Sequence, residues 1–187
     1  KIDPTWLQID STKKEASFAL IAAMGGDNSG MNFNGSHEGG LTLTVPAGWG
    51  VTLRFINKDA GMNHGATVVP YHVPIQDGAV SPVIAGAATD TTGIGLTPGS
   101  KASLHFTATP AGKYSLRCSA SGHSSMGMWL ILNVSKDAGP RIELKEDTPA
   151  VPPQKGPAEK VTPDDEDRQF ARWLFSIGAT DVRVTTA

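Results

Sequence analysis

Three side chains with metal-binding chemistry follow one another at equal spacing in the second half of the chain. Cys118, the only cysteine, is followed by His123 and then Met128, with four residues between each pair. Another histidine, His64, lies far upstream at the start of an expected strand. Two imidazoles, one thiolate and a weak axial thioether form the ligand set of type 1 (blue) copper sites. The residues therefore predict a copper centre with His64, Cys118 and His123 near one plane and Met128 as the long axial ligand.

The spacing also predicts how the chain positions these ligands. Cys118 is expected to end one strand and Met128 to begin the next, so the loop between them returns both to one edge of a sheet. The loop consists largely of small residues that let the backbone wrap closely around an ion, namely Ser119, Ala120, Ser121, Gly122, Ser124, Ser125 and Gly127. His64 must then come from a neighbouring strand.

Short apolar or alternating runs, separated by Gly, Pro and Asn, predict the strands. They cover 17–24, 41–45, 51–57, 66–69, 101–108, 113–118 and 128–134. The second and third of these runs, which are joined by a short loop, are expected to form an antiparallel pair. About seven short strands with turns between them predict an all-β Greek-key sandwich.

Two regions depart from this pattern. Residues 71–100 show little periodicity and are expected to be long loops with at most one strand, which are either functional or an insertion. Residues 137–165, rich in Pro and charge, predict a linker or a strap on the domain surface. Residues 166–187 are expected to hold a short amphipathic helix, with an apolar face at Phe170, Trp173, Leu174 and Ile177, and a tail. The expected domain is thus 1–136, followed by this C-terminal extension.

Composition excludes several classes of protein. The formal net charge is −2, and no basic run is dense enough to indicate nucleic-acid binding. No apolar run approaches the roughly 18 residues of a membrane span, and the first residues do not look like a signal peptide. Any association with a membrane would use a segment outside this chain.

Several short motifs resemble one known family. They are Gly112-Lys113-Tyr114, Gly122-His123 and Gly127-Met128-Trp129 around the ligands, with Asn32-Phe33-Asn34-Gly35 and Val45-Pro46-Ala47-Gly48-Trp49 upstream. Over about residues 17–135 the chain resembles the cupredoxins, and most of all the sulfocyanins, with the rusticyanins as near relatives. The residue after the first ligand is often Asn or Ser in that family. Here it is Gly65, which can contribute only its backbone.

The resemblance implies a function. A sulfocyanin-like protein would carry single electrons through one type 1 copper cycling between Cu(I) and Cu(II), and would not be an enzyme. It implies a respiratory chain at the outer, extracytoplasmic face of the cytoplasmic membrane, with a cytochrome complex and a terminal oxidase as redox partners. Electrons are expected to pass through the exposed edge of His123, with Met62, Met126 and Trp129 as candidates for an apolar ring around it.

The residues leave alternatives open. Cys118 is also compatible with a buried structural thiol, with a nucleophile paired to His64 or His123, or with a zinc site. Met126 is a rival axial ligand. A copper-binding or delivery protein without an electron-transfer role is the alternative function. Paired His-x-His motifs, which multicopper oxidases need, are absent from the sequence.

The remaining histidines and methionines have simpler interpretations. His37, His72 and His105 are expected to face solvent. Met24, Met31 and Met62 suggest a second Cu(I) site less strongly than they suggest filling of the core and of apolar patches.

Overall fold

The computed structural model describes residues 1–78 and 81–145. The expected C-terminal helix, and the extension beyond residue 145, lie outside this part of the chain. No helix within the described residues has the length and hydropathy needed to cross a bilayer.

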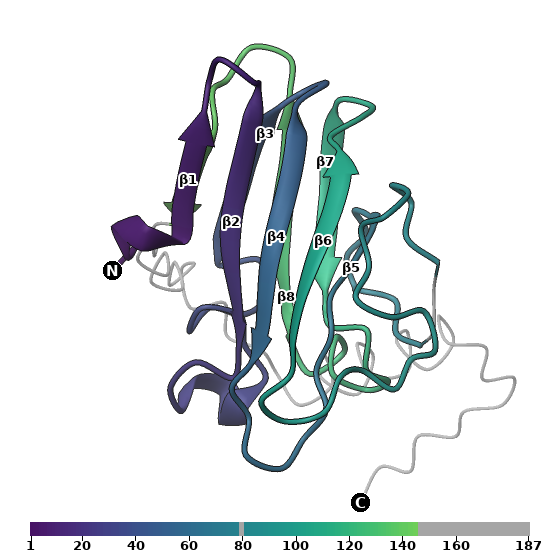
Figure 1. The fold of residues 1–187 in the computed structure, drawn as a ribbon. Coiled ribbons are helices and arrows are strands. Elements are labelled where there is room, and N and C mark those ends of the chain that lie inside the picture. Colours follow the sequence, from purple (N-terminus) through teal and green to yellow (C-terminus); the bar gives the residue numbers. More distant parts are fainter. Residues whose placement is uncertain (79–80, 146–187) are drawn as a thin grey trace, which may run out of the picture. The chain divides into compact units, whose positions relative to one another are not determined.

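The described residues form a β-sandwich of two sheets (Figure 1). The first sheet has the order β1-β2-β4-β6, with β1 Leu7–Asp10, β2 Glu15–Ala22, β4 Gly50–Asn57 and β6 Lys101–Thr107. The second has the order β5-β7-β8-β3-β9, with β5 Thr67–Pro70, β7 Gly112–Arg117, β8 Trp129–Ser135, β3 Leu41–Pro46 and β9 Arg141–Leu144. Two short 3₁₀ turns, η1 Pro4–Trp6 and η2 Asp27–Gly30, complete the elements. The all-β sandwich predicted from the sequence is confirmed.

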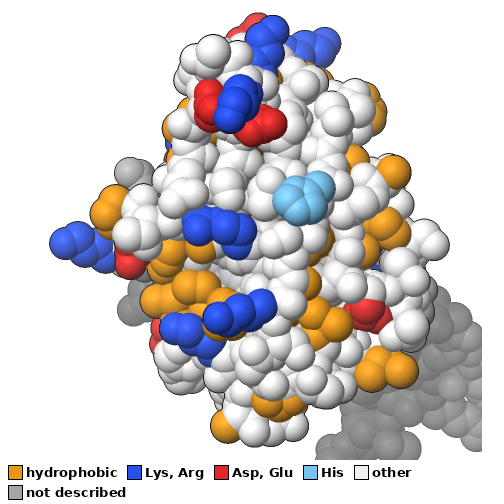
Figure 2. Space-filling view, viewed as in Figure 1, with side chains coloured by type: hydrophobic (Ala, Val, Ile, Leu, Met, Phe, Trp, Pro, Cys, Tyr) orange, Lys and Arg blue, Asp and Glu red, His pale blue; other side chains and the backbone are white. Residues whose placement is uncertain are grey.

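Strict alternation along the strands builds the core between the sheets. In β2 and β4 every second residue is buried, and β8 shows the same pattern. Phe18, Phe33 and Phe55 lie at the centre with at most 2% of their surface exposed. The outer face of the first sheet is mostly uncharged polar or backbone surface, with scattered Lys, Arg, acidic and hydrophobic side chains and one His (Figure 2). The side chains of this face project from the middle of the strands. The predicted metal ligands lie elsewhere, in loops at the strand ends.

The expected pairing of 41–45 with 51–57 is wrong. β3 pairs with β8 in parallel and with β9 antiparallel, whereas β4 pairs with β2 in parallel and with β6 antiparallel. The short loop 47–49 carries the chain from one sheet to the other. The two strands therefore bury their apolar faces in the same core from opposite sides, instead of forming a hairpin.

Two strands were not predicted. β1 is short and has no fully buried residue, so its sequence shows no alternation. β9 lies inside residues 137–165, where the sequence predicts a linker or strap, and it pairs antiparallel with the edge of β3. The first part of that range therefore extends the second sheet. Residues 71–78 and 81–100 form the expected long loop, with isolated bridges such as His64–Leu96 and Thr67–Ala88 in place of a strand.

Candidate metal centre

The second sheet brings three of the predicted ligands to one end of the sandwich. β7 and β8 pair antiparallel up to Arg117 opposite Trp129, and the Cys118 amide then donates to the Met128 carbonyl at 2.9 Å. This bond closes the loop that holds His123. β5 pairs antiparallel with the other side of β7, with Thr67 opposite Arg117. The residues just before β5, including His64, therefore lie beside Cys118 at the end of β7.

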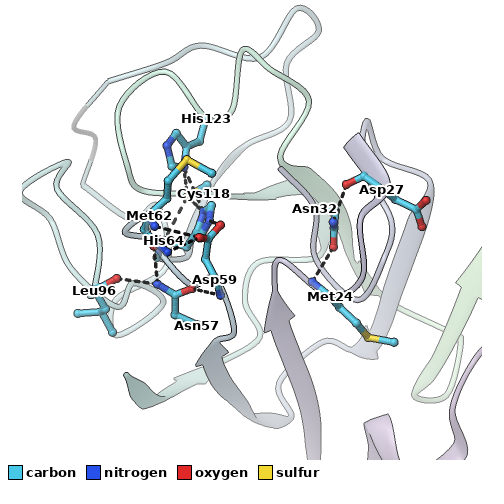
Figure 3. Close-up of polar contacts among 12 residues, drawn as sticks. Met24, Asp27, Asn32, Asn57, Asp59, Met62, His64, Leu96, Cys118 and His123 are labelled. Atoms are coloured by element: carbon cyan, nitrogen blue, oxygen red, sulfur yellow. Dashed lines mark hydrogen bonds and ion pairs between the residues drawn. The ribbon is translucent and has the colours of Figure 1, made fainter. Parts of the chain in front are cut away.

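The ligand atoms of the two histidines and the cysteine converge (Figure 3). The Cys118 sulfur lies 3.5 Å from Nδ1 of His123 and 3.9 Å from Nδ1 of His64. The two Nδ1 atoms are 3.1 Å apart. His64 and Cys118 are fully buried, while His123 is half-buried. The structure thus places one thiol and two imidazole nitrogens around a common point, as the sequence predicted.

A carboxylate fixes the orientation of the buried imidazole. Nε2 of His64 lies 2.9 Å from Oδ2 of Asp59. Because the carboxylate can only accept, Nε2 carries the proton and Nδ1 presents its lone pair to Cys118. A carboxylate on the far nitrogen of a ligand histidine is a common support of metal sites, since it sets the tautomer and raises the basicity of the ring.

Asp59 is itself held in place by its surroundings. Its carboxylate accepts the amides of Gly61 at 2.8 Å and Met62 at 2.9 Å. Burial opposes its ionisation, but the hydrogen bonds from Gly61, His64 and Met62 outweigh burial and lower the pKa of Asp59 to about 2. The buried side chain of Asn57 accepts the Asp59 amide at 3.0 Å, so the end of β4 supports the whole turn.

The thiol of Cys118 is protonated in the metal-free protein at neutral pH. Burial raises its pKa to about 11, although the Gly65 amide, which donates to the sulfur at 3.5 Å, favours the thiolate. Burial and the nearby His64 also lower the pKa of His123, which favours its neutral form. A metal that binds here must therefore displace the thiol proton, while the imidazoles bind as neutral groups.

The glycine after the first ligand is required by its neighbours. A Cβ at residue 65 would overlap Oγ of Ser119 and lie 2.6 Å from Oγ1 of Thr89. Ser119, which follows Cys118, donates to Asp90 at 2.5 Å, and Thr89 accepts the Ala66 amide at 2.8 Å. Hydrogen bonds from residues 89–90 thus tie the two ligand segments together, in the space where a side chain at position 65 would lie.

The two candidate axial methionines differ in burial. Met128 has no exposed surface, and its amide donates to the His123 carbonyl at 3.0 Å. Met126 is 51% exposed, and its carbonyl accepts a hydrogen bond from the Asn28 side chain at 2.8 Å. Burial beside two other ligands supports Met128 as the axial ligand, which stays a proposal.

The other histidines do not join the cluster. Among the described residues the only grouping of this kind is His64, Cys118 and His123. His72 and His105 are exposed, as expected, while His37 is half-buried beside Glu38. Met31 is buried in the core and Met24 packs against that core, which agrees with core filling, whereas Met62 is 38% exposed.

Four supporting residues were missed in the sequence: Asp59, Asp77, Asp90 and Arg117. Asp59 lies five residues before His64, and that closeness was the only available signal. Arg117 is fully buried although it directly precedes Cys118 on a strand. Asp77 and Asp90 belong to the long loop without periodicity, where the sequence gives no sign of which residues turn inward.

Comparison with known proteins agrees with this geometry. The family model of the sulfocyanin (SoxE) domain matches residues 4–141, which is most of the chain. The chain belongs to the sulfocyanin family. The match spans all the strands up to β8 and all four predicted ligands, so the resemblance inferred from short motifs is confirmed.

Individual relatives are distant. The sulfocyanin of Sulfolobus acidocaldarius is 25% identical over 134 residues, covering 68% of this chain and 67% of that protein. A crystal structure of rusticyanin variants is 22% identical with a TM-score of 0.50, over 70% of this chain and 86% of that one. Reduced auracyanin from Roseiflexus castenholzii is 21% identical with a TM-score of 0.48, and the match covers 64% of this chain and 96% of auracyanin. The rusticyanin likeness shows that the fold is that of a cupredoxin.

The residues present fit a type 1 copper ion. One thiol sulfur and two Nδ1 atoms face one another, and the Asp59 carboxylate sets the ring of His64. Copper held by these residues would supply a one-electron Cu(II)/Cu(I) couple. The chain is therefore a mononuclear blue-copper protein that carries single electrons.

Proposed function

We propose that this protein shuttles electrons between a cytochrome complex and a terminal oxidase of a respiratory chain, at the extracytoplasmic face of a membrane. The observation that carries the proposal is the convergence of His64, Cys118 and His123 in a site closed on its inner side. A buried thiol supports a retained redox centre more than a delivery site, because delivery requires ready exchange of the metal. Membership of the sulfocyanin family supports the respiratory setting.

We assign Met128 as the axial ligand and His123 as the route for electrons. His64 is fully buried and its outer nitrogen is bound to Asp59, so it offers no path to a partner. His123 is half-buried and sits at the middle of a surface loop. In this assignment the His123 ring connects the copper site to solvent, and the buried Met128 lies on the side of the site that faces the protein core.

Apolar side chains at this end of the molecule are suited to brief contact with a partner. Met62 and Met126 are 38% and 51% exposed, as required of the expected ring. Ile94, which sequence reasoning missed, is 64% exposed, and its neighbour Gly93 accepts the Ser121 amide of the ligand loop at 2.9 Å. Trp129 is half-buried and packs edge-on against Tyr71, so we place it at the border of this surface.

The decisive experiment is a visible and EPR spectrum of the protein loaded with Cu(II), before and after ascorbate. We expect an intense blue band and a narrow copper hyperfine splitting, both lost on reduction, and neither in Cys118→Ser because the band arises from the thiolate. A pale sample with wide splitting would refute the assignment as a blue-copper centre. Reduction by a cytochrome and reoxidation by a terminal oxidase of the same membrane would then test the partners.

A further inference from the structure

We propose that Asp77 is the positioning residue of His123, and that it acts as a clamp on the residues on both sides of this ligand, through the Gly122 amide and the Ser124 hydroxyl. The inference rests on the proposed role of His123 as a copper ligand and electron route. Such a ligand needs a fixed orientation while the outer edge of its ring stays free.

The contacts of Asp77 enclose His123 in the sequence. One carboxylate oxygen, Oδ2, accepts the Gly122 amide at 2.5 Å, and the other, Oδ1, accepts the Ser124 hydroxyl at 2.9 Å. The Ser125 hydroxyl, which donates to the Gly122 carbonyl at 2.7 Å, lies 3.4 Å from Oδ2. The residues directly before and after His123 are thus bound to one carboxylate. Because Asp77 comes from the long loop 71–100, these bonds join two segments that are far apart in the sequence.

A buried arginine anchors the clamp to the cysteine side of the site. Arg117 has no exposed surface. Its Nη1 donates to Oγ of Ser124 at 2.9 Å and to the Cys118 carbonyl at 3.2 Å, and its Nη2 donates to the Gly78 carbonyl at 2.6 Å. The guanidinium also lies 3.9 Å from Oδ1 of Asp77. Ser124 therefore accepts from Arg117 and donates to Asp77, which connects Cys118, the loop 71–78 and the backbone around His123.

The two imidazoles are oriented by different means. Asp59 holds His64 through the ring itself, at Nε2. Within the described residues no side chain binds the corresponding nitrogen of His123, and the carboxylate near this ligand binds its two sequence neighbours instead. A buried ligand can be fixed through its ring, whereas a ligand that passes electrons outward is fixed through the residues beside it, which leaves the ring edge open to a partner.

The test compares Asp77→Asn with Asp90→Asn in the full chain. Both remove one carboxylate charge from the same long loop, but Asp90 binds Ser119, beside Cys118, and not the backbone around His123. One readout is the ¹⁵N relaxation of the histidine rings in the metal-free protein. The other is the Cu(II) affinity, measured by competition with a chelator.

For Asp77→Asn we expect the His123 ring signals to broaden while those of His64 stay sharp, with Cu(II) affinity about 10- to 100-fold lower. In Asp90→Asn the His123 ring should stay as in the unmodified protein. Unchanged His123 signals in Asp77→Asn, with only a lower melting temperature, would overturn the proposal and leave a purely structural role.

A second variant keeps the proposal testable if the first one does not fold. If Asp77→Asn does not fold, Ser124→Ala removes the hydroxyl that joins Asp77 to Arg117. Mobile His123 ring signals in this variant support the clamp, and rigid ones overturn it. A failure of the proposed function would look different, because the unmodified protein would then show no blue copper while the metal-free ring dynamics would still report on the clamp.

Discussion

At the scale of single residues, the site separates groups that bind the metal from groups that orient them. The four candidate ligands were predictable because three of them lie within eleven residues and their types match one kind of copper chemistry. The orienting groups were not, since a carboxylate such as Asp59 is marked in the sequence only by its closeness to His64. Its importance follows only from the 2.9 Å contact with His64.

The two methionines of the ligand loop provide a matched pair. Met128→Leu should keep a blue site but change its reduction potential and its EPR parameters, because a buried thioether beside the metal would be lost. Met126→Leu should change little, since this side chain is 51% exposed. Both variants conserve size and hydrophobicity. A larger effect of Met126→Leu would assign the axial position to Met126.

Replacing Asp59 tests the carboxylate on His64. Asp59→Asn removes a negative charge that favours Cu(II), and should weaken Cu(II) binding relative to Cu(I) by about tenfold, which corresponds to a rise of about 59 mV in potential. Protein-film voltammetry gives this value directly. Asp10→Asn, which makes the same charge change at an exposed position on β1, should leave the potential unaltered.

At the scale of elements, the strands were easier to predict than their partners. Alternation in β2, β4 and β8 marks each strand because one face is buried. Alternation does not say which sheet a strand joins, and the pairing of β3 with β4 was wrong for this reason. The loop 71–100 was recognised as long, but the inward direction of Asp77 and Asp90 depends on tertiary hydrogen bonds that have no local pattern.

Two glycines of one segment test the close contact between the ligand loops. Gly65→Ala should destabilise the protein by about 1–3 kcal/mol and disturb the copper spectrum, because its Cβ would overlap Ser119 and Thr89. Gly61→Ala is the control, since a Cβ there would meet no atom within 4 Å. Denaturant unfolding of the metal-free forms measures the difference. Equal stability of the two variants would contradict the contact.

At the scale of the whole molecule, stability should depend on pH because three carboxylates around the site have a lowered pKa. The pKa of each is lowered in the folded protein, because hydrogen bonds outweigh the burial that opposes ionisation of Asp59, Asp77 and Asp90. The unfolded chain, with ordinary carboxyl groups, binds more protons at acidic pH than the folded protein does. These groups therefore stabilise the fold fully above their unfolded pKa and lose that contribution as the pH falls.

The contribution of these three carboxylates to the free energy of unfolding is expected to be level above about pH 5 and to decrease from there toward pH 2. Asp59 alone, with a pKa shifted from 3.8 to about 2, contributes about 2 kcal/mol at neutral pH. In metal-free Asp59→Asn the decrease should be correspondingly shallower. Denaturant titrations at a series of pH values measure this, and parallel curves for the two proteins would contradict the assigned pKa.

The parallel pairing of β3 with β8 has a consequence for how the protein is made. Residues 42–46 find their partners only at 131–135, near the end of the described chain, and β7 pairs with the same strand. Contacts between such distant segments form slowly, because a long stretch of chain must be closed first. During synthesis, Cys118 and His123 emerge before the strand that closes their loop. The binding site is thus completed only once the residues up to 135 are available to pair, and copper is expected to enter a domain whose two sheets have already formed.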